Sequence, residues 1–466
     1  MTLAELQKQI VGLNEKVPLL DGSQRGYVNF DNGASTPTLK PVMEKVNEFL
    51  KWYSNVHRGT GFKSQLSSSV FEKARDITAD FVNADDGCSV LFCKNTTEAI
   101  NKLAARFHCP GAGEEKPVIL TTIMEHHSNE LPWRKVGNVV HVELNDDGTI
   151  DLNDLRHNLD QYKDKIQLVA VTAASNVTGY INPVHTIARW VHAIGAQIAV
   201  DAAQVAAHRP MDVKPSNDPE HIDYLAFSAH KMYAPYGVGV LVTDKRLFEF
   251  GSPEYVGGGT VDIVNLESAY WKDLPEREEA GTPDIVGVVA LARVISLLQE
   301  VGFDSIVEHE SELTAYALEK LGKMSDITIY GDRNPETARE RLGVIAFNVK
   351  DVHHALVSAI LSYEGGIGAR NGCFCAHPYV KRLLGVSRNN AKEIETMIRA
   401  RDRSTIPGAV RVSFGLYNTK EEIDHLCDML QTVVNKSYRG TYTLNKERGE
   451  YHPVNFKADF SAYFHL

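Results

Sequence analysis

The chain has 466 residues, of which 43% are hydrophobic and 23% charged, as is typical of soluble globular proteins. This length predicts two or three domains. The net charge of −11 disfavours broad nucleic-acid binding, and no segment approaches the roughly 20 apolar residues of a membrane-spanning helix. The N-terminal residues also lack the features of a signal or transit peptide. We therefore expect a cytoplasmic protein that binds neither membranes nor nucleic acid.

Six cysteines are too few for a disulfide framework in a chain of this length, and a cytoplasmic setting would keep them reduced. Four of them lie in segments with strand-like or helix-like patterns and are expected to be inert core thiols: Cys88, Cys93, Cys109 and Cys427. The other two, Cys373 and Cys375, are close together in the sequence CFC. If the protein uses a reactive thiol, we therefore expect that thiol in the CFC segment.

In chain order, the first 20 residues predict a helix, and residues 27–36 predict a short strand that enters a polar turn. Residues 89–93 predict a strand, followed by a helix whose first turn carries capping residues. Six more short apolar runs follow, at 117–123, 139–145, 165–175, 196–203, 222–230 and 237–244. Because these runs are nearly continuously apolar and alternate with helical segments, they predict an α/β domain with a mostly parallel, seven-stranded type of sheet.

Beyond this region, residues 285–325 predict a long helical stretch, and further helices and strands indicate a smaller α+β domain. The predicted organisation is an N-terminal helical segment at 1–25, a large domain at 26–285, a small C-terminal domain at 286–435 and a tail at 436–466. A charged element at about 385–407 is expected to be an insertion in the small domain, and the tail is expected to pack on a neighbour.

Lys231 follows a predicted strand in the sequence FSAHKMYAPYG. A partly desolvated lysine amine is a good nucleophile toward an aldehyde-bearing cofactor, although a single lysine is more often a solvated surface residue. Asp201 ends another predicted strand and is suited to pair with the pyridinium nitrogen of pyridoxal phosphate. The alternative for Asp201 is a helix cap. Gln204 and Asn176 are candidates to reach the phenolic oxygen of the cofactor, although Asn176 also fits an ordinary turn.

Thr96 and Thr97 lie at a predicted strand-to-helix turn, where free backbone N–H groups favour an anion such as a phosphate. A simple threonine cap is the alternative. His126, after another predicted strand, is a candidate to cover an aromatic ring or to act as an acid or base. A metal site is the main alternative for the histidines. The candidate ligands are His126-His127, His353-His354 and Cys373-x-Cys375-x-His377, but no complete set of four zinc ligands is present. We therefore expect no metal.

Eleven segments together carry a family resemblance, and they occur in the order that the family has. They are FDNGAST (30–36), NVHRG (55–59), NTTEAIN (95–101), MEHHSN (124–129), SNVTG (175–179), DAAQ (201–204), FSAHKMYAPYGVGVL (227–241), GGG (257–259), AGTPD (280–284), ARNGCFCAHP (369–378) and RVSFGLYN (411–418). Over residues 25–435 the chain resembles the class V, fold-type I pyridoxal-phosphate enzymes, and most closely the SUF-type cysteine desulfurase and selenocysteine lyase family.

The resemblance implies a role for each matched residue. Lys231 would bond to the cofactor aldehyde, Asp201 would pair with the ring nitrogen, and His126 would stack on the ring. The remaining cofactor-binding residues would be Thr96, Thr97, Asn176, Gln204, Ser228, His230 and, from the other subunit of a homodimer, Thr282. The substrate-binding residues would be Asn176, Arg370 and Arg411, with Asn55, His57 and Arg58 lining the neighbouring active site.

In the family, a loop cysteine attacks the substrate sulfur, and Cys375 stands at that position. Cys373 departs from the usual pattern, and it is either a loop residue without a role or a second thiol that relays sulfur. The spacing from Cys375 to Arg411 is longer than usual because of the insertion. The resemblance implies conversion of L-cysteine, or a related sulfur amino acid, to L-alanine, with the sulfur passed through Cys375 to a protein or thiol acceptor, as in iron–sulfur cluster assembly.

Other functions stay open on the same residues. A selenocysteine lyase, a C–S β-lyase, or a class V aminotransferase or epimerase would use the same cofactor. A non-catalytic scaffold would not need Lys231, Asp201, His126 and Arg411 together.

Overall fold

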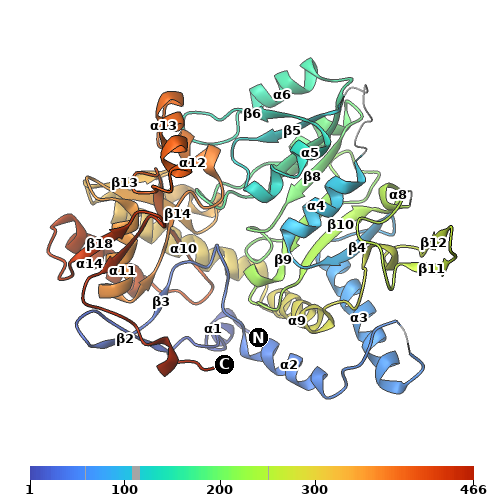
Figure 1. Ribbon diagram of the computed structural model, residues 1–466, viewed down its shortest axis with the longest axis horizontal. Helices are drawn as coiled ribbons and strands as arrows, with labels where there is room; N and C mark the ends of the chain where they lie inside the picture. The colour runs from blue at the N-terminus through green and yellow to red at the C-terminus, as the bar shows by residue number, and fades with distance from the viewer. Residues whose placement is uncertain (58, 108–115, 250) are drawn as a thin grey trace. The chain divides into compact units, whose positions relative to one another are not determined.

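A computed structural model describes residues 1–57, 59–107, 116–249 and 251–466 (Figure 1). Arg58 and Cys109 lie outside the described residues. The chain divides into two compact units. The first comprises residues 1–11, 34–175 and 180–308, and the second comprises residues 12–33, 176–179 and 309–466.

The first unit is built on a seven-stranded sheet in the order β4-β10-β9-β8-β7-β5-β6. Its strands are β4 (Cys88–Cys93), β5 (Val118–Thr122), β6 (Asn138–Val142), β7 (Ile166–Thr172), β8 (Gln197–Asp201), β9 (Tyr224–Ser228) and β10 (Gly239–Asp244). β5 to β9 pair in parallel, whereas β10 is antiparallel to both of its neighbours. β4 therefore points in the same direction as β5 to β9, and the carboxyl ends of these six strands meet at one edge of the sheet. The predicted α/β class and mostly parallel sheet are confirmed.

Helices flank this sheet (Figure 1). The helices of the first unit include α1 (Leu3–Gln7), α2 (Lys40–Leu50), α3 (Phe62–Phe81), α4 (Thr96–Arg106), α5 (Trp133–Val136), α6 (Leu152–Gln161), α7 (Val184–His192), α8 (Lys245–Phe248) and α9 (Ile285–Val301). α9 is apolar on nearly every face and is largely buried, and it packs against α2 and α3. Short 3₁₀ turns follow β5 (η1, His127–Asn129) and β9 (η2, Ala229–Lys231), and another precedes α9 (η3, Glu276–Glu278).

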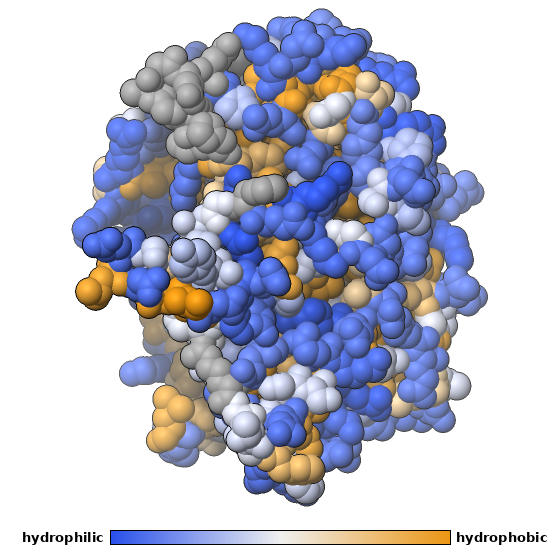
Figure 2. Space-filling view, turned by 90° about the vertical axis from the view of Figure 1, so that its right-hand side faces the viewer, coloured by the Kyte–Doolittle hydropathy of each residue, from blue (hydrophilic) through white to orange (hydrophobic). Residues whose placement is uncertain are grey.

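A hairpin of β11 (Val261–Val264) and β12 (Ala269–Trp271) carries exposed apolar side chains. These are Ile263, Val264, Leu266 and Tyr270. Figure 2 shows a face of the molecule that is largely hydrophilic, with separate hydrophobic groups standing out on it. Several exposed apolar side chains on one hairpin mark a place where a partner can pack.

The second unit contains a four-stranded antiparallel sheet in the order β13-β14-β17-β16. The strands are β13 (Ile327–Tyr330), β14 (Val344–Val349), β16 (Arg370–Gly372) and β17 (Ala409–Ser413). The helices are α10 (Phe303–Gly322), which starts in the first unit, α11 (His354–Gly365), α12 (His377–Leu383), α13 (Arg388–Arg399) and α14 (Lys420–Val434), with a 3₁₀ turn η4 (Pro335–Glu340). Apolar side chains of α10, α11 and α14 form a core with this sheet.

Three short two-stranded pairs complete the second unit. They are β1 (Lys16–Pro18) with β2 (Gln24–Gly26), β3 (Val28–Asn29) with β15 (Ile367–Gly368), and β18 (Tyr442–Asn445) with β19 (Glu450–Pro453). A final 3₁₀ turn, η5, spans Phe460–Ala462. β3 and β15 pair in parallel although they lie far apart along the chain, so the second unit is assembled from distant segments.

The N-terminal segment corrects one sequence-based prediction. A helix was expected over the first 20 residues, but it covers only Leu3–Gln7. Gly12 and Gly22 have positive φ angles of 82° and 84°, which turn the backbone out of helical geometry and allow the β1–β2 hairpin. Similarly, the predicted long helix at 285–325 is divided into α9 and α10 at Gly302, where φ is 83°.

Among the described residues no single helix is long and apolar enough to cross a membrane. Only α9 and α10 taken together meet the length and composition test, and they are bent by 81° relative to each other.

Candidate active site

Five polar residues lie at the ends of two neighbouring parallel strands of the first unit or just after them. We call them the lysine group: Asp201, Gln204, Ser228, His230 and Lys231. Asp201 is the last residue of β8 and pairs in register with Ala226 of β9. Ser228 ends β9, and Lys231 closes the turn η2 directly after it. The parallel register thus brings these residues to the same edge of the sheet, as the sequence predicts.

Asp201 is only 5% exposed, and its Oδ1 accepts a hydrogen bond of 2.9 Å from the backbone N–H of Ala203. Burial raises the pKa of this carboxyl group, while the nearby Lys231 ammonium acts in the opposite direction. Burial also lowers the pKa of His230 to about 4, assisted by the Lys231 charge, so His230 is neutral at physiological pH. The lysine group therefore combines a buried acid, a neutral imidazole and a partly exposed amine.

The N-terminus of α4 lies against the end of β9. The Ser228 Oγ accepts a hydrogen bond of 2.8 Å from the backbone N–H of Thr96, and it lies 2.6 Å from the Thr96 hydroxyl. A Cβ atom at Gly239 of β10 would come within 2.4–2.8 Å of the Asn95 backbone, so only glycine fits there. The Asn95 side chain caps α4 by accepting from the Glu98 N–H. This packing fixes a helix N-terminus beside the lysine group.

Hydroxyl groups connect this helix terminus to His126. The Thr97 Oγ1 lies 2.7 Å from the Ser128 Oγ, and Ser128 lies 3.1 Å from the His126 Nδ1. The Ser128 backbone N–H also donates to that Nδ1, so the ring nitrogen acts as the acceptor. Thr97 is exposed, and His126 is half-buried. The helix dipole and the exposed hydroxyl together favour an anion at this point.

Glu125, next to His126, is a buried acidic residue that was not among the predicted site residues. It is 2% exposed and accepts hydrogen bonds from the Thr172 N–H at 3.0 Å, the Thr122 hydroxyl at 2.7 Å and the Asn129 amide at 2.7 Å. Burial raises the pKa of Glu125 to about 8, and the negative charge of Asp201 adds to this effect. Its signal in the sequence is its place in the segment MEHHSN, directly after the apolar run 117–123.

Three other predicted residues of the first unit have contacts of their own. Thr282 is exposed and lines a cavity with Lys94 and Glu98. His57 is half-buried and lies 3.3 Å from Glu72 and 3.4 Å from Glu276. Asn55 is exposed, and its carbonyl accepts from the Ser64 hydroxyl. The interactions of these residues are thus with neighbours outside the lysine group.

Cys375 belongs to the thiol loop, residues 370–378 of the second unit. It is exposed, and both Phe374 and Cys375 have positive φ angles, 52° and 55°. Non-glycine residues adopt this backbone geometry at a cost, and two in succession hold the thiol out of the surrounding structure. Cys373 differs sharply: it is 6% exposed, and its Sγ donates to the Pro407 carbonyl at 3.1 Å. Burial raises the pKa of the Cys373 thiol to about 11, which keeps it protonated.

Arg411, on β17, is 2% exposed and carries the most deeply buried positive charge beside this loop. Its Nη2 pairs with the Asp31 Oδ1 at 2.8 Å, and its guanidinium carbon lies 5.2 Å from the centroid of the Phe374 ring. The Arg411 Nε is buried and has no hydrogen-bond partner among the described residues. A buried donor without a partner destabilises the fold, so the Arg411 Nε–H is suited to donate a hydrogen bond to an anionic ligand.

Asp31 joins two arginines. Arg370 and Arg411 are opposite each other in the β16–β17 register, and the Arg370 Nε lies 3.0 Å from the Asp31 Oδ2. Arg370 is exposed, so only Arg411 is held in a dry environment. The sequence analysis matched the FDNGAST motif without singling out Asp31, because the partner arginines lie more than 300 residues away.

Asn176 belongs to the second unit. Its side-chain amide donates to the Phe374 carbonyl at 2.8 Å, and its own carbonyl accepts from the Arg411 Nη1 at 3.0 Å. The structure therefore brings Asn176, Arg411 and the thiol loop together within one unit. The substrate-binding and cofactor-binding roles implied for Asn176 both stay predictions.

Comparisons with known proteins agree with this architecture. Residues 28–426 match the family model described as aminotransferase class-V, and the chain belongs to this family. A probable cysteine desulfurase from Halalkalibacterium halodurans is 36% identical over 431 residues, covering 91% of this chain and 97% of the relative. Another from Pyrococcus abyssi is also 36% identical, over 422 residues, and covers 89% of this chain and 96% of the relative.

Solved structures give the same result. The apo structure of a cysteine desulfurase from Thermococcus onnurineus aligns with a TM-score of 0.79 at 33% identity, covering 94% of this chain and 99% of that one. A cysteine desulfurase from Escherichia coli, in an S-sulfonic acid form, aligns with a TM-score of 0.75 at 27% identity, covering 94% and 100%. The fold-type I architecture and the cysteine desulfurase likeness inferred from the sequence are confirmed.

Proposed function

We propose that this chain is a pyridoxal-phosphate-dependent cysteine desulfurase, which converts L-cysteine to L-alanine and receives the substrate sulfur on Cys375. The observation that carries the proposal is the thiol loop. It presents an exposed cysteine on a left-handed backbone, beside a buried arginine with an unpartnered Nε. Relatives that are 36% identical over nearly their full length and are named probable cysteine desulfurases support the same activity.

The residues of the first unit fit pyridoxal phosphate. The α4 N-terminus, with Thr96, Thr97 and Ser228, offers hydroxyl and N–H groups for a phosphate. The buried Asp201 carboxylate, whose charged form is disfavoured by burial, would be stabilised by a cationic ring nitrogen. Gln204 and His126 complete the polar and aromatic surroundings. When bound, the cofactor makes the Cα–H and Cβ–S bonds of an attached amino acid labile.

Lys231 would supply the amine that holds the cofactor aldehyde, and the same amine would move the proton at the substrate Cα. In the second unit, Arg411 would bind the substrate carboxylate through its unpartnered Nε, while Asp31 holds the other side of the guanidinium. The buried Arg411 guanidinium, held in one orientation by Asp31, would then orient the substrate.

Cys375 performs the sulfur transfer. Its thiolate forms a bond to the substrate sulfur while the Cβ–S bond of the substrate breaks, and the electron pair of that bond passes to the carbon skeleton. The proton that leaves the Cys375 thiol is balanced by one that Cβ takes up to become the methyl group of alanine. The products are alanine and a Cys375 persulfide, and two equivalents of an acceptor thiol release the sulfur as sulfide.

We further propose a homodimer in which Thr282, Asn55, His57 and Arg58 serve the neighbouring subunit. One support is the set of exposed apolar side chains on the β11–β12 hairpin, which a second subunit could cover. Another is that Thr282 and His57 contact residues outside the lysine group of their own chain. The proposed setting is the cytoplasm, with a thiol-bearing protein as sulfur acceptor.

The test measures the products formed from L-cysteine in the presence of a thiol reductant. The proposal expects alanine and sulfide in equal amounts, lost in Cys375→Ala and kept in the matched control Cys373→Ala. Pyruvate and ammonia that persist in Cys375→Ala would identify a C–S β-lyase instead. Activity restricted to selenocysteine would identify a selenocysteine lyase.

A further inference from the structure

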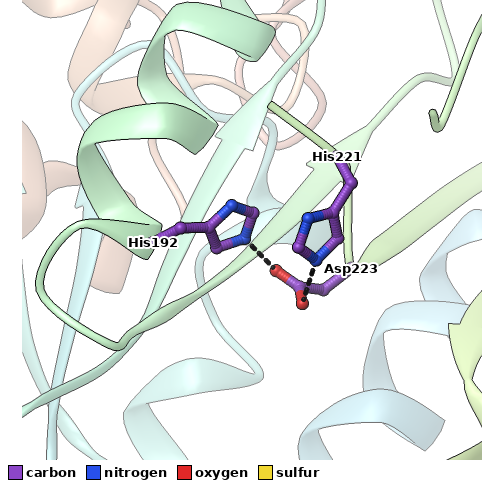
Figure 3. A group of neighbouring side chains, drawn as sticks. All are labelled: His192, His221 and Asp223. Carbon is purple, nitrogen blue, oxygen red and sulfur yellow. Dashed lines mark hydrogen bonds and ion pairs between the residues drawn. The ribbon is translucent and has the colours of Figure 1, made fainter. Parts of the chain in front are cut away.

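A second cluster of chemically active side chains lies at the other end of the strand that leads to Lys231. His192 is the last residue of α7, and Asp223 comes directly before β9, with His221 two residues earlier (Figure 3). β9 has five residues, so the two ends of the strand are about 16 Å apart. This cluster is therefore separate from the lysine group.

The three side chains point toward one another (Figure 3). The His192 Nε2 lies 2.9 Å from the Asp223 Oδ2, and the His221 Nε2 lies 3.2 Å from the Asp223 Oδ1. The two imidazole rings are stacked, with centroids 4.0 Å apart and planes inclined by 15°. One potential metal-ligand atom from each residue lies within 4.8 Å of the others.

The outer nitrogens of both rings are already committed. The His192 Nδ1 lies 2.8 Å from the Pro219 carbonyl oxygen, and the His221 Nδ1 lies 2.6 Å from the Asp218 carbonyl oxygen. A carbonyl oxygen only accepts hydrogen bonds, so each Nδ1 carries a proton. In a neutral ring the Nε2 then holds a lone pair, and both lone pairs face the oxygens of one carboxylate. Without a cation between them, each Nε2 that hydrogen-bonds to the ionised carboxylate must carry a proton, which places positive charge on stacked rings.

We propose that His192, His221 and Asp223 bind a divalent transition-metal ion of the zinc class. Two imidazole nitrogens and a carboxylate oxygen are a set of ligands that zinc accepts, with water in the remaining position. Ligand atoms around tetrahedral zinc are about 3.3 Å apart, and the two spacings between a ring nitrogen and a carboxylate oxygen, 2.9 and 3.2 Å, are close to this value. The Nδ1–H groups that donate to backbone carbonyls are the supporting contacts that metal-bound histidines usually make.

The surroundings also suit an ion that enters from solvent. The side chains of His192 and His221 are 15% and 19% exposed, whereas Asp223 is 6% exposed. The Ile198 backbone N–H donates to the Asp223 Oδ2 at 2.8 Å, which fixes the orientation of the carboxylate. A bound ion would tie the end of α7 to the start of β9. Its role would be to stabilise this end of the sheet, since the reaction proposed above does not use it.

The test titrates Zn²⁺ into metal-free holoenzyme that carries Cys375→Ala, because an exposed thiol would otherwise compete for zinc. We expect one equivalent to bind and the unfolding temperature to rise. His192→Gln and His221→Gln should each weaken binding at least 10-fold. His185→Gln on the same helix is the matched control and should leave binding unchanged. The visible absorbance of the cofactor shows whether each variant is folded.

X-ray absorption of the zinc-loaded protein gives a second test that needs no variant. Two imidazole ligands with oxygen and no sulfur in the coordination shell support the proposal. Sulfur ligands, the absence of stoichiometric binding, or binding unchanged in both His192→Gln and His221→Gln would overturn it.

Discussion

The two groups of site residues are built in different ways. The lysine group follows buried strands of a parallel sheet, where register alone places Asp201 and Lys231 at one edge. The thiol loop has no such frame. Its key residue, Cys375, is exposed and has a positive φ angle. The neighbouring Phe374 is contacted by the Asn176 side-chain amide and by the buried Arg411.

This difference separates two physical requirements. A cofactor that stays bound needs fixed, partly desolvated contacts, which a sheet edge supplies. A thiol that receives sulfur and then delivers it to an acceptor must remain accessible, which a loop supplies. The predictions below test whether each group depends on its own kind of support.

The largest expected effect concerns Lys231. Lys231→Arg keeps a positive charge near Asp201 but removes the nucleophilic amine, so turnover of L-cysteine should fall more than about 1,000-fold. In the wild type, borohydride reduction should attach the cofactor permanently to the chain, and in the variant it should not. Lys73→Arg, on the exposed side of α3, is the control. Turnover retained in Lys231→Arg would contradict the assignment.

The two cysteines of the thiol loop should differ about 100-fold or more in their reaction with iodoacetamide at pH 7.5. Burial raises the pKa of Cys373 to about 11, well above that of a solvated thiol, and the thiolate is the reactive form. Cys375 is exposed and should be alkylated first. Peptide mass spectrometry over time measures both rates. Equal rates would show that Cys373 is accessible enough to relay sulfur.

The arginines that share Asp31 should also behave differently. Arg411→Lys removes the directed Nε–H donor from a buried position, and kcat/KM for L-cysteine should fall about 10- to 100-fold. Arg370→Lys changes an exposed ion pair and should alter kcat/KM less than about threefold. Steady-state kinetics of both variants measure the contrast. Equal losses would mean that burial of Arg411 is not what matters for substrate binding.

The last prediction concerns the pH dependence of stability and Glu125. Burial raises the pKa of Glu125 to about 8, so between pH 4.5 and 8 the folded state keeps a proton that the unfolded state has released. This residue therefore makes the protein less stable as pH rises through that window, by at most about 1.4 kcal/mol per pH unit. Denaturant unfolding of Glu125→Gln from pH 5 to 7.5 should lack this contribution. A parallel pH profile for the variant and the wild type would contradict the assigned direction.

The strands of the large sheet and the residues that follow them could be predicted from the sequence, since apolar runs end directly before Asp201 and Lys231. Asp31 could not, because its importance arises from a pairing with arginines on β16 and β17 that no local pattern encodes. The different environments of Cys373 and Cys375 were also out of reach. They follow from backbone angles and from a contact with Pro407, and not from residue type.

The zinc-class cluster shows the same limit. The histidine pairs predicted as candidates are adjacent in sequence, whereas His192 and His221 are 29 positions apart. They meet because α7 packs on β8, the neighbour of β9 in the sheet. His353 and His354, by contrast, are neighbours in sequence, and the His354 ring nitrogens contact Asn371 and the Ile406 carbonyl. Proximity along the chain was a poor guide to shared chemistry.

The pairing of distant segments in the second unit has a consequence for protein synthesis. Asp31 and Arg370 are 339 positions apart, and β3 pairs with β15 across a similar separation. At about 5–20 residues per second, a ribosome needs about 17–70 s to deliver the second partner after the first has emerged. During that interval β3 has no strand to pair with, and Asp31 has no arginine partner. Chaperones that shield nascent chains should therefore matter more for the second unit than for the first.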